Sequence, residues 1–361
     1  TYTSGSVITT GSSLLCRGAS TVLNCSGMNG TGGASKFNNI SFDTTTTSVL
    51  LSDIYCSNTL TLGNTTLLPI INGVGFNVNA GGNVTVGITT GTVTGTATVV
   101  MTGTSATLST SAITTGYIGV NLKFNTTGTI TINSTLPYRT GTITNISSGT
   151  VTAPTLLDIQ ASAGLSAAGI TWNNITLASG ITLTQGSNNA LSGTLTTAGT
   201  TTINGAYTLS GSKWILGTTT LAGSSTVIFT GNAFASDTIS GTALTVNSTG
   251  TLSFLGTLIW SVPTFTKTAG TITNTGGKLL ITSNKTFNGA TTWGSWDVSG
   301  SPTITMNALQ SFSGTLSIGT NATFNGTAGF TATSLESISP GTTITLQSAN
   351  TYTVSSSFVS S

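Results

Sequence analysis

Two tryptophans stand three residues apart in the segment TTWGSWDVSG, at Trp293 and Trp296, and Asp297 follows directly. An exposed aromatic pair beside a carboxylate suits carbohydrate binding, because the face of an aromatic ring matches the apolar face of a pyranose. The same rings would also fill a core or pack between subunits, and that structural use is the stronger expectation. Trp293, Trp296 and Asp297 are therefore candidate glycan contacts with a structural alternative.

Carboxylate chemistry is the main catalytic route open to this chain. The chain contains no His, which removes Ser-His and Cys-His nucleophiles and most zinc sites. Polysaccharide cleavage uses a pair of carboxylates. The candidates are Asp43, Asp53, Asp158, Asp237, Asp297 and Glu336. Each more often sits in a turn and accepts backbone hydrogen bonds, so we expect no catalytic residue, no cofactor and no metal site.

The three cysteines, Cys16, Cys25 and Cys56, all lie near the start of the chain. They lack CxxC spacing and a His partner, so a metal cluster is unsupported. One disulfide with a spare thiol is one expectation for an exported protein, and three buried thiols are the alternative. The spacing does not say which pair would form, and the odd cysteine could link neighbouring subunits.

Charge is scarce along the whole chain. Its 8 Lys and Arg and 6 Asp and Glu make 4% of 361 residues, against about 25% in an ordinary soluble domain. A net charge of +2 spread so thinly makes no basic patch, which excludes nucleic acid as a partner. Hydrophobic residues reach 37% and the dominant polar residue is the β-branched Thr, which predicts ordered β structure. No apolar run is long enough for a transmembrane helix, so we expect no membrane insertion.

The clearest pattern is a glycine at every sixth position in the middle of the chain. The glycines are Gly193, Gly199, Gly205, Gly211, Gly217 and Gly223. Aliphatic residues stand two positions before the later ones, at Ile203, Leu209, Ile215 and Leu221, and the phase continues to Val227. A short strand with a Gly corner makes one flat face, and three faces close a coil of about 18 residues. Ile203 would then stack on Leu221, and Leu209 on Val227.

These hexads predict an all-β fold, a β-solenoid with about three strands per coil and a β-rich N-terminal module. Tandem antiparallel β-sandwich modules with Gly turns are the alternative. Helix signals are nearly absent, because Gly or Thr interrupts every candidate segment. Composition divides the chain into a Cys-containing β module at 1–80, a Thr/Val/Gly-rich transitional β segment at 81–155 and a β-repeat module at 156–361 with a closing strand.

The stretch from about Gly164 to Phe330, with runs such as ITWNNITLASGITLTQG and TLSIGTNATFNGTAG, resembles repeat-rich β-solenoid fibre proteins. Filamentous adhesins and autotransporter passengers of bacterial surfaces, and tail-fibre shafts of phages, share such Thr/Gly/Asn-rich strand repeats. The resemblance covers under half of the chain. It implies an extracellular, cell-surface or virion location and a scaffolding or adhesive role, and no catalytic or receptor residue carries over.

We therefore expect a structural subunit that assembles with copies of itself into a filament, fibre or surface layer. Low charge leaves strand edges open to pairing, and the terminal stretches Thr3–Thr10 and Thr342–Val354 are the expected joints. One alternative is an adhesin or receptor-binding fibre whose Trp-bearing region contacts surface glycans. A second alternative is a polysaccharide-cleaving spike.

Overall fold

A computed structural model describes residues 13–16, 21–23, 37–65, 67–110, 112–205, 208–211, 213–223, 226–230, 238–275 and 277–360. The described residues are all-β with no helix, and their parallel strands stack as a β-solenoid of about 14 turns. The predicted β-solenoid is therefore confirmed, and the alternative of antiparallel β-sandwich modules is wrong. Among the described residues, no helix has the length and apolar character needed to cross a membrane.

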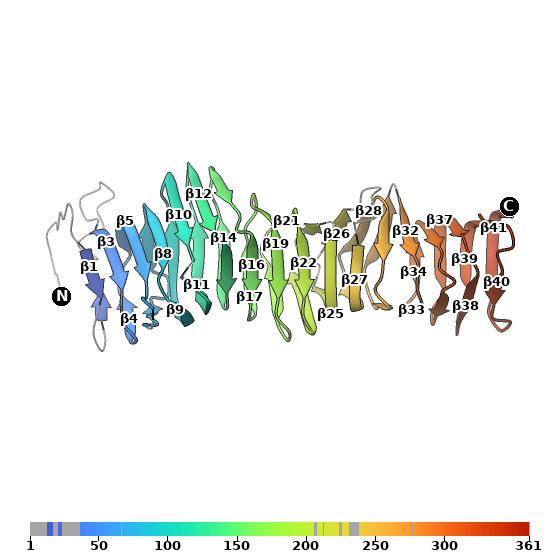
Figure 1. Cartoon of the computed structure of the whole chain (residues 1–361), viewed down its shortest axis with the longest axis horizontal. Helices are drawn as coiled ribbons and strands as arrows, with labels where there is room; N and C mark the ends of the chain where they lie inside the picture. Colours follow the sequence, from blue (N-terminus) through green and yellow to red (C-terminus); the bar gives the residue numbers. More distant parts are fainter. Residues whose placement is uncertain are drawn as a thin grey trace. The chain divides into compact units, whose positions relative to one another are not determined.

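The strands belong to two compact units, Thr1–Ile175 with Gly186–Asn189 and Thr176–Gln185 with Ala190–Ser361, called unit 1 and unit 2 below. Figure 1 labels many of these strands. The first strands are β1 (Ser13–Cys16), β2 (Thr21–Leu23), β3 (Phe37–Phe42), β4 (Thr47–Leu50), β5 (Ile54–Leu62), β6 (Ile70–Asn72), β7 (Asn77–Ala80), β8 (Asn83–Val86), β9 (Thr90–Met101), β10 (Ser105–Ser109), β11 (Thr115–Phe124), β12 (Thr129–Asn133), β13 (Thr135–Tyr138), β14 (Gly141–Asn145), β15 (Thr150–Thr152), β16 (Leu156–Ile159), β17 (Ala163–Ser166) and β18 (Thr171–Trp172).

The remaining strands continue the same pattern. They are β19 (Asn174–Leu177), β20 (Thr182–Gln185), β21 (Asn189–Leu191), β22 (Thr194–Thr197), β23 (Thr200–Gly205), β24 (Thr208–Gly211), β25 (Lys213–Gly223), β26 (Thr226–Thr230), β27 (Thr238–Ser248), β28 (Thr251–Leu255), β29 (Leu258–Trp260), β30 (Thr264–Lys267), β31 (Thr271–Thr275), β32 (Lys278–Ile281), β33 (Lys285–Asn288), β34 (Thr291–Trp293), β35 (Ser295–Val298), β36 (Thr303–Met306), β37 (Gln310–Ile318), β38 (Ala322–Gly326), β39 (Phe330–Ser337), β40 (Ile344–Leu346) and β41 (Tyr352–Ser360).

The coils of unit 2 have three strand-bearing faces, and in some coils one long strand such as β37 covers two of them. β32 pairs with β35, β33 with β36 and β34 with β37, always in parallel. Lys285 pairs with Ile304 and Thr291 with Gln310, so the chain returns to the same face after one full coil. The prediction of about three strands per coil is confirmed by this register.

Alternation along each strand separates the core from the surface. In β36, Ile304 and Met306 are buried while the threonines between and beside them are half-buried on the outside. On neighbouring coils the outward threonines stand in register, as Thr202 does with Thr220. β-Branched residues suit this pleated position, and paired hydroxyls stabilise adjacent strands. The scarcity of charge is therefore compatible with a wettable surface.

The aliphatic residues of the hexads stack as their spacing predicts, with one exception. Ile203 pairs with Leu221, and both side chains are buried. Leu209 pairs with Val227, whose side chain is also buried. Such columns bury one aliphatic side chain against the next, as with Ile203 and Leu221.

Ile215 is the exception, and its assignment to the core is wrong. Its side chain is 42% exposed. Both of its neighbours in β25, Trp214 and Leu216, are buried. Side chains alternate between the two faces of a strand, so the inward Trp214 turns Ile215 outward.

The glycines of the hexads lie where the coil turns. Gly193 and Gly199 lie between strands, and Gly205, Gly211 and Gly223 end β23, β24 and β25. Gly217 lies within β25, at the bend where this strand leaves its pairing with β22 and begins its pairing with β23. At Gly205 the backbone has a φ of +134°, and a Cβ there would meet the carbonyl oxygen of Gln185 at 2.5 Å. Glycine is required at this corner by both conformation and space.

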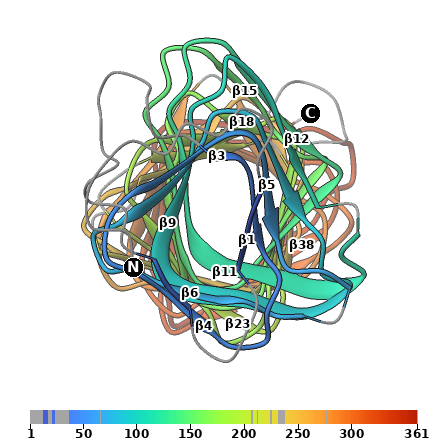
Figure 2. The same cartoon turned by 90° about the vertical axis from the view of Figure 1, so that its left-hand side faces the viewer.

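Unit 1 is also a parallel coil around one interior. Figure 2 shows its strands, among them β9, β11 and β5, wrapping around a common centre. β5 pairs with both β7 and β8, and β8 with β10, so the coil continues through residue 80. The division of the chain at 1–80, 81–155 and 156–361 stays a prediction.

Candidate functional site

Trp293 and Trp296 lie inside unit 2. Their side chains are 1% and 0% exposed. The two rings are 5.2 Å apart between centroids, and the ring of Phe287 lies 5.6 Å from Trp293 and 4.8 Å from Trp296. The indole N–H of Trp293 donates to Oε1 of Gln310 at 2.9 Å. A sugar cannot reach either ring, so the predicted glycan contact at Trp293 and Trp296 is wrong and the structural alternative holds.

Asp297 points away from this aromatic core, because it stands between the buried Trp296 and Val298 in β35. It pairs with Ser317, which pairs in turn with Glu336 on the next coil. Adjacent strands are about 4.8 Å apart, so the Asp297 and Glu336 backbones are separated by about 10 Å.

This column places two of the candidate acids two strands apart on the outside of unit 2. Inverting glycosidases hold their carboxyl groups about 6.5–9.5 Å apart, close to the backbone separation of Asp297 and Glu336. Between the two acids, the ammonium group of Lys278 lies 3.5 Å from Oγ of Ser317, at the outer limit of a hydrogen bond. The polysaccharide-cleaving spike stays a prediction.

Two other acidic candidates have structural partners. Asp43 is buried and accepts a hydrogen bond from the side-chain amide of Asn64. Asp53 accepts the backbone N–H of Asn77 at 2.8 Å, as expected for a carboxylate beside a turn. Asp237 lies outside the described residues.

The cysteines also occupy structural positions where they are described. Cys16 ends β1 and is buried. Cys56 is buried in β5, carries a free thiol and lies 3.4 Å from the carbonyl oxygen of Asn38. Burial raises the pKa of the Cys56 thiol, which makes it a poor nucleophile. Cys25 lies outside the described residues, and no disulfide includes Cys56.

A hollow of unit 1 opens where two neighbouring strands separate. β11 and β13 are in register at one position, Ile118 with Tyr138. The opposite edge of β11 pairs with β9, and the opposite edge of β13 pairs with β16 along its whole length. Pro137 in β13 has no N–H to offer the ladder. The gap forms a groove of about 290 Å³.

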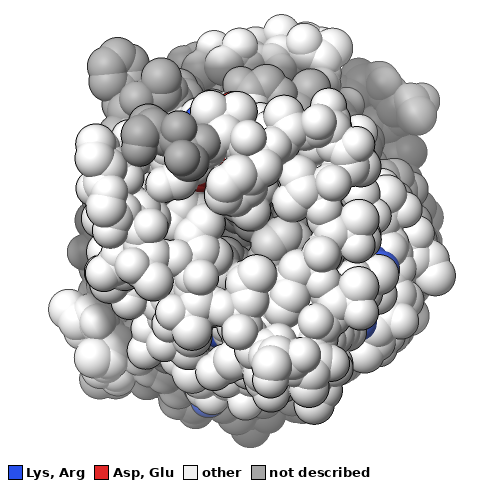
Figure 3. Space-filling view, turned by 90° about the vertical axis from the view of Figure 1, so that its right-hand side faces the viewer, with Lys and Arg blue, Asp and Glu red and all other residues white. Residues whose placement is uncertain are grey.

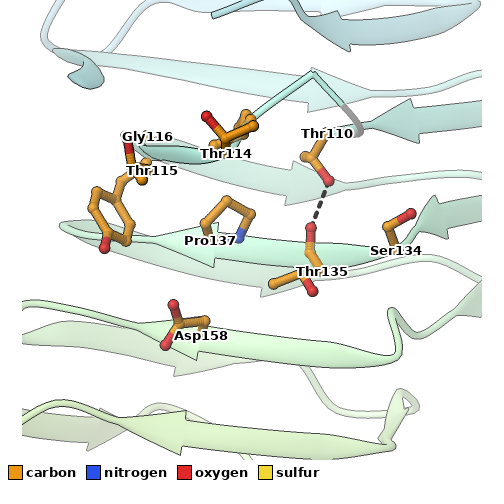
Figure 4. Close-up of a pocket in the computed structure, with 10 residues that line it drawn as sticks. Thr110, Thr114, Thr115, Gly116, Ser134, Thr135, Pro137 and Asp158 are labelled. Atoms are coloured by element: carbon orange, nitrogen blue, oxygen red, sulfur yellow. Dashed lines mark hydrogen bonds between the residues drawn. The ribbon is translucent and has the colours of Figure 1, made fainter. Parts of the chain in front are cut away.

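The groove is lined from both strands and from the coil beyond (Figure 4). Thr114 and Thr115 lie along one side and Ser134 and Pro137 along the other, and Asp158 reaches in from β16. Pro137 and Asp158 are direct neighbours across the β13–β16 ladder. The hollow therefore combines hydroxyls, a proline ring and one carboxylate.

One end of the groove is closed by Thr110. Its hydroxyl donates to the backbone carbonyl of Thr135 at 2.5 Å and lies 3.2 Å from the carbonyl of Asn133. Ser134 lies between these two residues with a φ of +61°. A non-glycine residue in the left-handed region carries strain, which is common at binding sites.

Asp158 is the one ionisable group that lines the groove and has a perturbed pKa. Burial raises the pKa of its carboxyl group, and a hydrogen bond from Nε2 of Gln160 to Oδ1, 2.7 Å long, opposes that shift. Its other oxygen has no hydrogen-bond donor among the described residues. The carboxylate is therefore partly desolvated and only half satisfied.

An aromatic ring completes the groove. Tyr117 lines it from β11, and the guanidinium carbon of Arg139 lies 5.4 Å from the centroid of the Tyr117 ring. A guanidine nitrogen of Arg139 also donates to Oγ1 of Thr92 at 3.3 Å. This contact holds Arg139 on the tyrosine and stabilises the position of the ring.

Sequence reasoning named Asp158 as one acid among several and missed Tyr117 and Ser134. A local signal was available in the run TLPYR, because a proline inside a strand marks a break in the ladder. Metal binding has no support here, since no group of three or more His, Cys, Asp or Glu residues gathers among the described residues.

A second surface feature is the last coil of unit 2. β41 pairs with β39, and β40 with β38, and in the described part of the chain no strand pairs with their opposite edges. Phe358 and Val359 of β41 are 61% and 50% exposed, and Leu346 of β40 is also exposed. Leu346 and Phe358 help to line a cavity of about 380 Å³.

Comparison of the chain with protein-family models, with curated proteins and with solved structures finds no match in any of the three.

Proposed function

We propose that this chain is a structural subunit that assembles with copies of itself into a filament, fibre or surface layer. The observation that carries the proposal is the open edge of the last coil, where β40 and β41 present unpaired backbone groups and apolar side chains together. A strand edge of this kind is a template for another strand. The occupant we propose is a second copy of the chain.

The charge distribution supports this proposal. β41 contains no Asp, Glu, Lys or Arg between Tyr352 and Ser360. Soluble proteins commonly protect exposed edges with charged side chains, proline or a covering segment. Figure 3 looks onto this side of the molecule and shows a surface that is almost entirely uncharged. Repulsion between like charges would therefore not oppose contact between copies.

Parallel strands give such contact a direction. All strand ladders of the described residues are parallel, so the edge of a coil on one copy has the polarity needed to continue a coil on another. Pairing between two different edges is heterologous and does not close on itself, which extends a filament. Leu15 of β1 and Val22 of β2 are exposed apolar residues on the first described coil, a suitable opposite edge. The predicted joint at Thr3–Thr10 lies outside the described residues.

The test is assembly as a function of protein concentration. Analytical ultracentrifugation and negative-stain microscopy of the purified chain should give growing oligomers and then filaments. A Phe358→Lys/Val359→Lys double variant should remain monomeric, because each new charge would have to be buried in the joint.

Ile215→Lys is the matched control, since Ile215 is also an exposed apolar strand residue but pairs with strands on both sides. This variant should assemble like the wild type. Monodisperse monomers of the wild type at high concentration would contradict the proposal, as would filaments that the double variant leaves unchanged.

The same proposal includes an extracellular, cell-surface or virion location, which rests on the sequence resemblance alone. It also includes the absence of enzymatic activity. The spike alternative is tested by incubating polysaccharides with the chain and measuring new reducing ends. Cleavage that is lost in both Asp297→Asn and Glu336→Gln would favour the spike over the structural subunit.

A further inference from the structure

The groove between β11 and β13 brings a carboxylate, an aromatic ring and several hydroxyls to one space on unit 1. We propose that it binds a neutral saccharide, with Asp158 accepting hydrogen bonds from sugar hydroxyls and Tyr117 contacting the sugar ring. This inference does not depend on self-assembly, because the groove and the open edge of β41 belong to different units.

The first argument is that the Asp158 carboxyl group keeps one oxygen for a ligand. Burial without a cation disfavours its charged form, and Gln160 satisfies only one of its oxygens. Arg139, which directly follows the neighbouring strand β13, contacts Tyr117 and Thr92. A desolvated carboxylate with a vacant acceptor in a groove is a strong partner for hydroxyl donors, because water competes weakly there.

The second argument is the apolar part of the lining. Tyr117, Pro137 and Ile113 all line the groove. A pyranose has one face of C–H groups and a rim of hydroxyls, so it requires an apolar surface next to hydrogen-bonding groups. Arg139 holds the Tyr117 ring in place before any ligand arrives, which reduces the entropy lost on binding.

The third argument is the supply of hydroxyl groups. Thr115 and Ser134 line the groove, are exposed, and have no hydrogen-bond partner for their hydroxyls among the described residues. Thr114 donates to the carbonyl of Thr89 at 2.9 Å, which leaves its oxygen as an acceptor. Hydroxyls that can donate or accept match the mixed hydrogen bonding of a sugar.

The fourth argument selects the class of ligand. The charge of Asp158 disfavours acidic ligands, and Arg139 is already engaged. Calcium takes six to eight oxygen ligands, commonly from several carboxylates, and this groove supplies one carboxylate. A volume of about 290 Å³ lies at the lower end of small-molecule sites, which suits one or two sugar rings.

The experiment is a glycan array with neutral and carboxylated oligosaccharides, followed by calorimetric titration with the neutral oligosaccharides that bind. We expect binding to neutral members only. Asp158→Asn should weaken it by about tenfold, because a charged acceptor is replaced by a neutral one. Tyr117→Ala should weaken it by a similar factor. Asp158→Asn keeps the shape of the site and removes a desolvated charge, so the variant should stay folded.

Asp297→Asn is the matched control, since Asp297 is a half-buried carboxylate of unit 2 outside the groove. It should bind like the wild type, and so should the Phe358→Lys/Val359→Lys variant. A blank array, preferred binding of carboxylated glycans, or neutral binding that Asp158→Asn leaves unchanged would overturn the proposal. A titration with Ca²⁺ alone that reports binding lost in Asp158→Asn would overturn it as well.

Discussion

The aromatic core of unit 2 offers a comparison between two tryptophans that differ in one hydrogen bond. Trp293 and Trp296 are both fully buried, and their rings touch. The N–H of Trp293 donates to Gln310, whereas the N–H of Trp296 is buried without an acceptor among the described residues. Replacing each by Phe removes similar volume, so the comparison isolates the hydrogen bond. We expect Trp293→Phe to destabilise unit 2 more than Trp296→Phe.

The magnitude follows from what each substitution leaves behind. Gln310 is fully buried, and its amide nitrogen already donates to the carbonyls of Ala308 and Gly289 at 2.7 and 3.2 Å. This anchoring keeps Oε1 of Gln310 in place when Trp293 is removed. An unpaired buried acceptor costs about 1–3 kcal/mol. Trp296→Phe leaves no such group and removes an unpaired donor. Trp293→Phe should therefore lower the free energy of unfolding by about 1–3 kcal/mol more than Trp296→Phe does.

The assay is urea denaturation followed by far-UV circular dichroism, because fluorescence would change with the tryptophans themselves. A double-mutant cycle with Gln310→Leu separates the hydrogen bond from the loss of ring volume. In the Gln310→Leu background the two Trp→Phe variants should become nearly equal. A solenoid can unfold in stages, so the comparison uses the first transition that all variants share.

Equal destabilisation by the two Phe variants in the wild-type background would refute this reasoning. The same holds if Gln310→Leu leaves the difference between them intact. Either result would mean that the cost of the substitution lies in the packing of the rings and not in the indole hydrogen bond.

Three further predictions use the same denaturation assay. Gly341→Ala should lower the free energy of unfolding by about 1 kcal/mol, because its φ is +77° and the space around it is open. Gly326→Ala should lower it by about 1–3 kcal/mol more, because a Cβ there would meet the carbonyl of Met306. Equal losses would contradict the steric argument. Burial lowers the pKa of Lys285 from its usual 10.5, so the unfolded chain binds this proton more tightly than the folded chain. The free energy of unfolding should therefore rise with pH between the lowered pKa and 10.5. This rise should be missing in Lys285→Met. Burial raises the pKa of Asp158 above 3.8, so the folded chain binds this proton more tightly than the unfolded chain. The resulting stabilisation is present at acidic pH and is lost as pH rises through the folded-state pKa. Asp158→Asn should therefore be more stable than the wild type at neutral pH but not at acidic pH.

The coil itself could be predicted from the sequence because its determinants are local and repeated. A glycine at every sixth position and an aliphatic residue two positions before it define a strand and a corner wherever they occur. That is why Ile203, Leu221 and Val227 lie in the core as expected. It is also why Gly217 marks a bend even inside a continuous strand.

Side-chain direction within one strand was less predictable. The hexad phase places Ile215 inward, but Trp214 occupies the core position beside it and the pleat turns Ile215 to the surface. For Trp293 and Trp296 the sequence left a glycan contact open beside the stronger expectation of a structural role, and the chain bends between β34 and β35 so that both rings face the interior. Competition between neighbours for the core decides such cases.

The residues that could bind a ligand show what the sequence alone does not predict. By itself the sequence determined that this protein is Thr-rich, sparsely charged and without His, and its glycine period favoured a β-solenoid over antiparallel sandwich modules, since composition and period are properties of the chain alone. Only the tertiary structure decided that Tyr117 and Asp158 share one groove, because they come from separate coils and meet where Pro137 interrupts the ladder between them. Such a juxtaposition depends on the register of stacked coils, which no short stretch of sequence encodes.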